Sequence, residues 1–286
     1  MPNNNQIIQW YPGHMSKAIR NIEQDLRLID IVIEVLDARI PQSSRNESLE
    51  KLCGKKPLVL VLNKSDLADD ALTKRWLQYY RHKGYQAISL YAVQKRGIKD
   101  LVTAVSKAAE PLQKRLEAKG RERRPVRAMV VGIPNTGKST VINALTDNAV
   151  AKTGNKPGVT RGRQWLKTSL GIELMDTPGI SWPKFTSAEA AYKLAATGAV
   201  ADAAFPVYPV ADYMVQWIAA HHPQGITERY QMETLSGDTQ QILGAIGHKR
   251  GILASGGIVR LEDVALIFLQ EYRKGKLGRF TLESPE

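Results

Sequence analysis

Residues 128–140 read AMVVGIPNTGKST, and this stretch predicts the fold around it. The apolar run 128–132 has the composition of a buried strand, and the residues from 138 to 145 read as a helix. Between them, Gly132 and the triplet 137–139 match the pattern G-x-x-x-x-G-K-[ST]. Between a strand and a helix, this pattern forms a phosphate-binding loop. The sequence therefore predicts an α/β nucleotide-binding domain.

The side chains of this loop have distinct expected roles. Lys138 is expected to reach the β- and γ-phosphates and to assist catalysis, and the Ser139 hydroxyl to ligate Mg²⁺. Gly137 lets the backbone amides converge on the phosphates, and the helix that follows adds its positive end. The remaining loop residues expected to contact the nucleotide are Asn135, Thr136 and Thr140.

Two motifs downstream complete a phosphate site. Asp176-Thr-Pro-Gly179 closes a strand-like run, and we expect Asp176 to hold Mg²⁺ and the Gly179 amide to face the γ-phosphate. Thr160, in the glycine-rich stretch KPGVTRG (156–162), is expected to contact both the metal and the γ-phosphate. DTPG is a common turn and threonines are common in loops. Their position after a phosphate loop is what distinguishes them.

A base-recognition motif stands earlier in the chain, in VLVLNKSDL (59–67). In Asn63-Lys64-x-Asp66, the carboxylate can accept the N1–H and exocyclic amine of guanine, which adenine does not offer. Asn63 can bond the base or a neighbouring loop, and the Lys64 stem can pack on the ring. Tyr91 and Ala92 are expected to touch the guanine edge through their backbone. These residues favour a GTPase over a P-loop kinase or ATPase.

The chain divides into two predicted domains. Residues 1–185 alternate strand-like runs (30–39, 57–66, 85–92, 128–132, 171–179) with helical stretches (72–84, 98–120), which predicts a parallel sheet. A basic linker spans about 115–127. Residues 186–286 show helical periodicity, and residues 261–278 show it most clearly.

Composition bounds the class of protein. The 40 basic and 28 acidic residues give a net charge of +12, which favours an anionic partner such as nucleic acid. No apolar run approaches the about 18 residues of a membrane span, and no signal-peptide pattern begins the chain. We therefore expect a cytoplasmic protein with no membrane partner. The single cysteine, Cys53, excludes an internal disulfide.

With the base reader placed before the phosphate loop, the chain resembles the circularly permuted GTPases, and more narrowly the ribosome biogenesis GTPase A family. The resemblance runs nearly end to end. Its motifs are IQWYPGHMSKA (8–18), DARIPQSSRN (37–46), NKSDL, GIPNTGKST, PGVTRG, DTPGISWPK (176–184), LGAIGHKRGILASGG (243–257) and YRKGKLGRFTLE (272–283). Tyr91 departs from the small or polar residue usual in that family.

The resemblance implies an RNA-binding helical C-terminal domain and GTP hydrolysis stimulated by the ribosomal particle. The implied partners are the large ribosomal subunit precursor, its rRNA and ribosomal proteins, and the protein is expected to be a monomer off the ribosome. The implied cofactors are Mg²⁺ and K⁺, with Asn135 as the potassium ligand. Asn135 as a residue that only shapes the loop remains the alternative.

Two further predictions concern catalysis and RNA. Many GTPases orient water with a glutamine after the DTPG-like motif, but Ile180 stands there, so His14 is the candidate. The alternative is that 10–13 is a docking turn and that His14 only binds backbone or rRNA. The residues expected to bind RNA phosphates are Lys249, Arg250, Arg273, Lys274, Lys276 and Arg279. The alternative is a solvated basic face.

Three functions follow from these patterns. The first is an assembly GTPase that binds the immature large subunit and leaves after hydrolysis. The second is a GTP-gated RNA-binding module with little turnover. The third, an ATP-using P-loop enzyme, is disfavoured by Asn63 and Asp66.

Overall fold

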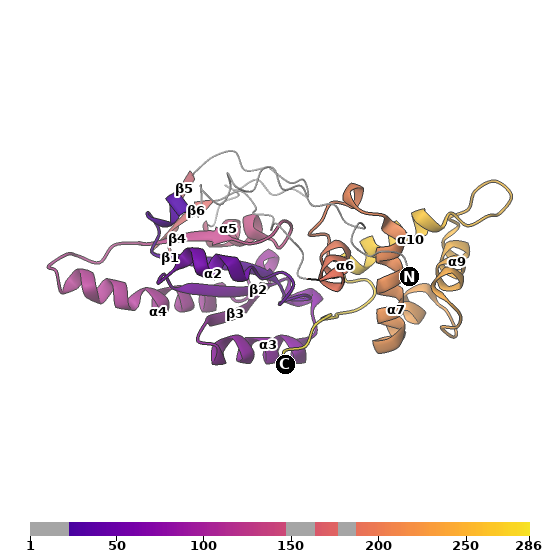
Figure 1. The fold of residues 1–286 in the computed structure, drawn as a ribbon, viewed down its shortest axis with the longest axis horizontal. Coiled ribbons are helices and arrows are strands. Elements are labelled where there is room, and N and C mark those ends of the chain that lie inside the picture. Colours follow the sequence, from indigo (N-terminus) through magenta and orange to yellow (C-terminus); the bar gives the residue numbers. More distant parts are fainter. Residues whose placement is uncertain (1–22, 147–163, 177–186) are drawn as a thin grey trace. The chain divides into compact units, whose positions relative to one another are not determined.

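The computed structural model describes residues 23–146, 164–176 and 187–286 (Figure 1). Their contacts divide them into two compact units. The α/β unit holds the described residues up to Asp176 together with Thr281–Glu286, and the helical unit holds 187–280. The sequence placed the last six residues in the helical domain, whereas they pack with the α/β unit.

The α/β unit is built on a six-stranded sheet of order β3-β2-β1-β4-β6-β5. Its strands are β1 (Ile31–Asp37), β2 (Leu58–Asn63), β3 (Gln86–Leu90), β4 (Val126–Val131), β5 (Gln164–Lys167) and β6 (Ile172–Asp176). All neighbouring pairs are parallel except β5–β6. The predicted parallel sheet is confirmed. The antiparallel edge strand β5 was not predicted.

Helices cover both faces of this sheet. One face packs against α4 (Ile98–Glu117) and α5 (Lys138–Thr146), and the other packs against α2 (Glu47–Cys53) and α3 (Asp70–His82). Side chains of β1 alternate between the faces, so Ile33 and Val35 meet the first layer while Val32 and Leu36 meet the second. The strands are apolar on both sides because both sides are covered.

The helical unit contains α6 (Ala188–Ala196), α7 (Val207–His221), α8 (Gln224–Tyr230), α9 (Thr239–Arg250) and α10 (Leu261–Arg273). α10 packs against α6, α7 and α9, and its Val264, Phe268 and Tyr272 are buried, as the periodicity predicts. Asp238 begins α9 through a capping box with Gln241. In the described ranges, none of the helices has the length and apolar character needed to cross a membrane.

Candidate nucleotide-binding site

The candidate site residues gather at one edge of the sheet. Because β1, β2, β3, β4 and β6 are parallel, their carboxyl ends meet there, which is where open α/β sheets bind ligands. Asp37 ends β1, Asn63 ends β2, and Gly132 follows β4. Ala92 lies just beyond β3, in the short 3₁₀ helix η2 (Ala92–Gln94). Motifs that are far apart in the chain therefore belong to one site.

Two glycines allow the phosphate loop to pack closely against its neighbours. A Cβ on Gly132 would lie 2.4 Å from the Val35 carbonyl oxygen, and one on Gly137 would lie 2.3 Å from Asn63 Nδ2. Gly137 also has φ +93°, a conformation that disfavours residues with a Cβ. The loop can follow this path only with glycine at both positions.

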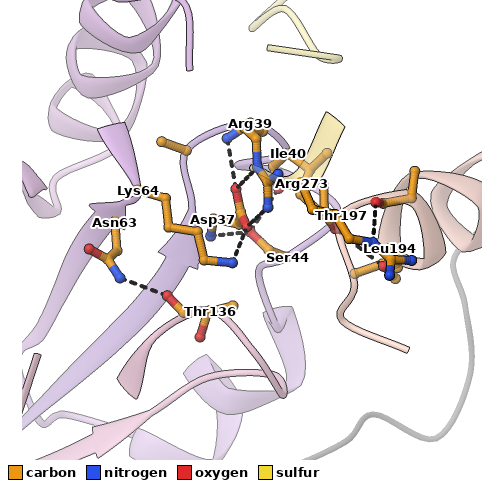
Figure 2. A network of polar contacts seen from close by, with 12 residues as sticks. Asp37, Arg39, Ile40, Ser44, Asn63, Lys64, Thr136, Leu194, Thr197 and Arg273 are labelled. Carbon is orange, nitrogen blue, oxygen red and sulfur yellow. Dashed lines mark hydrogen bonds and ion pairs between the residues drawn. The ribbon is translucent and has the colours of Figure 1, made fainter. Parts of the chain in front are cut away.

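Asn63 connects the base reader to the phosphate loop. Its Nδ2 donates to the Thr136 carbonyl over 2.8 Å (Figure 2), and its Oδ1 accepts from the Ala92 amide over 3.3 Å. The side chain is buried. Of the two roles open for Asn63, the structure shows the bond to the neighbouring loop. Tyr91 precedes this contact, and its own amide donates to the Arg96 carbonyl.

Lys64 is held by a charged network that the sequence did not predict. Its Nζ donates to Asp37 Oδ2 over 2.9 Å, while Arg39 grips the same carboxylate through Nε at 2.9 Å and Nη2 at 2.7 Å. Burial alone would raise the pKa of Asp37, but the charges of Arg39 and Lys64 outweigh it and hold that pKa well below its usual value. Asp66, in η1 (Ser65–Leu67), remains partly exposed.

The other predicted loop residues lie between the end of β4 and the first turn of α5. Lys138 Nζ donates to the Ile133 carbonyl over 2.8 Å, and the buried Thr136 hydroxyl donates to the same oxygen over 3.1 Å. Asn135 has φ +60°, so its backbone contributes to the turn of the loop. Ser139 and Thr140 lie in the first turn of α5 and are partly exposed.

The metal residues can be placed only in part. Asp176 ends β6, where its backbone pairs with Val130 of β4, and only its backbone is described. Ser139 follows β4 through the phosphate loop, so both residues belong to the carboxyl edge of the sheet. A hydroxyl and a carboxylate are oxygen donors of the kind that Mg²⁺ prefers. His14, Thr160, Ile180 and Gly179 lie outside the described residues.

The six basic residues of the helical unit differ in what they contact. Arg273 donates to the Ala195 and Ala196 carbonyls and pairs with Asp202, so packing alone accounts for it. Arg250 pairs with Glu271, and Lys249 donates to the Gln231 carbonyl. The exposed residues in this set are Lys249, Arg250, Lys274, Lys276 and Arg279. Their contact with RNA stays a prediction.

Glu271 is the acidic partner at the centre of this region. Burial would raise its pKa, but the hydrogen bonds from Arg229 and the charges of Arg250 and Arg229 outweigh burial and lower it to about 2. Arg229 grips the carboxylate with two nitrogens, and Lys276 lies 4.0 Å away. The contact with Arg250 is therefore part of the internal packing of the helical unit.

Comparison with known proteins agrees with this geometry. Residues 127–242 match the family model described as "50S ribosome-binding GTPase", a segment that begins after the base reader. The chain is 44% identical to ribosome biogenesis GTPase A of Bacillus cereus over 98% of this chain and 95% of the relative. It is 32% identical to the protein of the same name from Thermotoga maritima, over 98% and 95%.

Solved structures give the same match. The GDP-bound structure of YlqF from T. maritima superimposes with a TM-score of 0.64 at 26% identity, over 93% of this chain and 99% of that one. The GNP-bound form of the same protein gives 0.63 at 29% identity, over 94% and 99%. The joined base reader and phosphate loop, together with these near-full-length relatives, show that the chain is a GTPase and belongs to the ribosome biogenesis GTPase A family.

Proposed function

We propose that this GTPase is an assembly factor of the ribosome. It binds the immature large subunit through rRNA and couples GTP hydrolysis to a late maturation step and to its own release. The observation that supports GTP as its substrate is the bond from Asn63 to the Thr136 carbonyl, which joins the base reader to the phosphate loop. The names of its relatives support the ribosomal role.

The described residues have separable tasks in this proposal. Asp66 reads the guanine edge, Lys64 lies under the ring, and the loop amides with Lys138 bind the phosphates. Ser139, Asp176 and Thr160 would hold Mg²⁺ and Asn135 would hold K⁺, and both cations would supply positive charge against the phosphates. Gly179 senses the γ-phosphate, and His14 orients the attacking water.

We read the order of the motifs as a circular permutation. Asn63 precedes the phosphate loop in the chain, yet the two touch in the fold. Reopening a compact domain at a new point leaves its packed core unchanged. The permutation places the residues after Asp176, which carry the γ-phosphate sensor, directly before the helical unit. The nucleotide state can thereby act on RNA binding.

Measuring GTP turnover in KCl and in NaCl, with and without purified large subunits, tests this proposal. We expect turnover to rise with the particle and to be faster in KCl. A chain whose GTP form binds the particle while turnover stays unchanged would be the GTP-gated binding module instead. Equal binding of the GTP and GDP forms would contradict the coupling. Competition by excess ATP would contradict the guanine assignment.

The role of His14 is tested separately. On the particle, we expect His14→Ala to hydrolyse GTP much more slowly than the unaltered protein while it binds GTP equally well. If its rate on the particle equals that of the unaltered protein, His14 has no catalytic role.

A further inference from the structure

The charged network around Asp37 is largely buried. Only 3% of the Asp37 side chain and 1% of the Arg39 side chain are exposed, against 24% for Lys64. Burying such charges costs solvation energy, and a buried ion pair is often no more stabilising than apolar residues of equal volume. The buried pair of Asp37 and Arg39 also binds the Lys64 ammonium group, which lies at the edge of the nucleotide site. This contact fixes the direction of the Lys64 side chain.

The backbone around Lys64 is fixed in the same way. Lys64 has φ +58°, a left-handed conformation that is uncommon for a residue with a Cβ. Asp37 pairs with Asn63 in the sheet register, and the Ala38 amide donates to the Asn63 carbonyl over 2.8 Å. Asp37, at the end of β1, therefore holds the Lys64 ammonium group, and Ala38, just after β1, holds the backbone of the residue before Lys64.

Arg39 is in turn held by the C-terminal end of the chain. The Leu282 amide donates to the Arg39 carbonyl over 2.8 Å, and the Thr281 hydroxyl donates to the Ala38 carbonyl over 3.4 Å. Thr281 and Leu282 are buried. The last residues thus pair with the segment that carries Arg39, although they lie more than 200 residues away in sequence.

Glu283 anchors this segment. Its carboxylate accepts from the Gln42 amide at 2.7 Å and from the Ser43 amide at 3.2 Å, and it also accepts the Ser43 hydroxyl. Its carbonyl oxygen accepts from Trp76 Nε1 over 3.1 Å. One residue therefore connects the tail to α3 and to the loop that follows Arg39.

We propose that Asp37 and Arg39 are positioning residues for Lys64, and that Thr281–Glu283 fixes them, so that guanine-nucleotide affinity depends on the C-terminal end of the chain. The proposal rests on the assignment of Asn63-Lys64-x-Asp66 as the guanine reader. Thr281 directly follows the helical unit in the chain, so the segment that contacts Arg39 is covalently joined to that unit.

Replacing Asp37 by Asn tests the first half of the proposal. The amide keeps the shape but removes the charge that Lys64 and Arg39 share, so we expect GDP and GTP to dissociate faster and their Kd to rise about tenfold. The effect should fall on KM more than on kcat, because the phosphate loop is untouched. Fluorescent GDP and GTP analogues measure the dissociation rates.

Asp30→Asn is the matched control. Asp30 precedes the same strand and also binds an arginine through two nitrogens, Arg124 Nη1 at 2.7 Å and Nη2 at 2.8 Å, at the end of β1 away from the site. We expect Asp30→Asn to leave the Kd for GDP unchanged. Unchanged Kd in Asp37→Asn, or an equal loss in both variants, would overturn the positioning role.

The tail is tested by Glu283→Ala against Glu286→Ala, which removes the same charge at an exposed position. We expect Glu283→Ala to raise the Kd for GDP about threefold, and Glu286→Ala to leave it unchanged. Equal Kd values for GDP in Glu283→Ala and Glu286→Ala would overturn the role of Thr281–Glu283. This test does not depend on whether Asp37→Asn folds. A third variant separates the two assignments. If Asp66→Ala keeps the preference for GTP over ATP, the assignment of Asn63-Lys64-x-Asp66 as the guanine reader is wrong, whereas the positioning of Lys64 by Asp37 and Arg39 is not contradicted.

Discussion

Gly137 is the residue at which the two halves of the nucleotide site touch. We expect Gly137→Ala to abolish nucleotide binding, because its Cβ would lie 2.3 Å from Asn63 Nδ2 and so push apart the base reader and the phosphate loop. Gly84→Ala is the control, since Gly84 shares a left-handed φ of +88° but has open space around it. That variant should cost about 1 kcal/mol of stability and leave the Kd for GDP unchanged. Isothermal titration with GDP measures the Kd of both variants.

Glu34 gives the α/β unit a pH-dependent stability. Its carboxyl group is fully buried in β1, accepts the Asn46 amide at 2.7 Å and lies 3.8 Å from Arg45 Nε. Burial raises its pKa from 4.5 to about 7, against the opposing effects of Asn46 and Arg45. The folded state therefore keeps this proton where the unfolded state has lost it, and stability falls as the pH rises from 4.5 to about 7.

Glu34→Gln should remove this slope. The amide cannot titrate, yet its oxygen can still accept the Asn46 amide, so the free energy of unfolding should change less between pH 5 and pH 8. The loss in the unaltered protein is at most on the order of 3 kcal/mol. Urea unfolding of the α/β unit at each pH measures it, with the exposed Glu122→Gln as control. An unchanged slope in Glu34→Gln would mean that other groups carry it.

Single residues differ in how well the sequence predicts them. Gly137 and Lys138 belong to a pattern with one known geometry, so their positions were predicted. The sequence assigns no role to Asp37 and Arg39 beyond their place in a family motif, because an aspartate at a strand end has many possible partners. Their role depends on the register of β1 against β2, which no local pattern gives.

Helices and strands, like single residues, were predicted where a local sequence pattern specifies them. The long strands and helices were predicted because their apolar periodicity runs over many residues. β5 was missed because it has only four residues. It is held by pairing with β6 and by Arg127 lying over the Trp165 ring. The seven-residue α2 was missed too, since Leu49 and Cys53 are its only described buried apolar residues.

Helix α9 offers a matched pair of glycines within one element. A Cβ on Gly244 would meet nothing within 4 Å, so Gly244→Ala should stabilise the helical unit by about 0.5–1 kcal/mol. A Cβ on Gly247 would lie 2.3 Å from Val259 Cγ1 and 3.0 Å from Val264 Cγ2, so Gly247→Ala should destabilise it by about 1–3 kcal/mol. Hydrogen exchange of α9 amides measures both. Equal effects would show that helix propensity alone governs this element.

At the scale of the whole chain, the sequence predicted two domains but not how they are joined. The chain enters the helical unit after the residues that follow Asp176, and it returns to the α/β unit at Thr281. The return was missed because residues 281–286 are too few to show a period. Their contacts with Arg39, Ser43 and Trp76 become visible only in the folded chain.

The effect of the net charge of +12 on RNA binding depends on where the basic residues lie. Lys249 and Lys274 are exposed in the helical unit, whereas the guanidinium of Arg273 is bound to carbonyls and to Asp202. If the lysines contact rRNA phosphates, the double variant Lys249→Ala/Lys274→Ala should bind large subunits more weakly. Its plot of log K against log salt should be less steep by about 1–2 units.

The control removes the same charge elsewhere. Lys99→Ala/Lys107→Ala changes two exposed lysines of α4 and should leave the salt slope unchanged. Arg273→Ala should instead lower the stability of the helical unit, because four hydrogen bonds to α6 and Asp202 are lost. Pelleting with large subunits between low and moderate salt measures binding. If both double variants reduced the salt slope equally, the affinity would depend on net charge. If rRNA contacts only the surface that carries Lys249 and Lys274, only that double variant should reduce the slope.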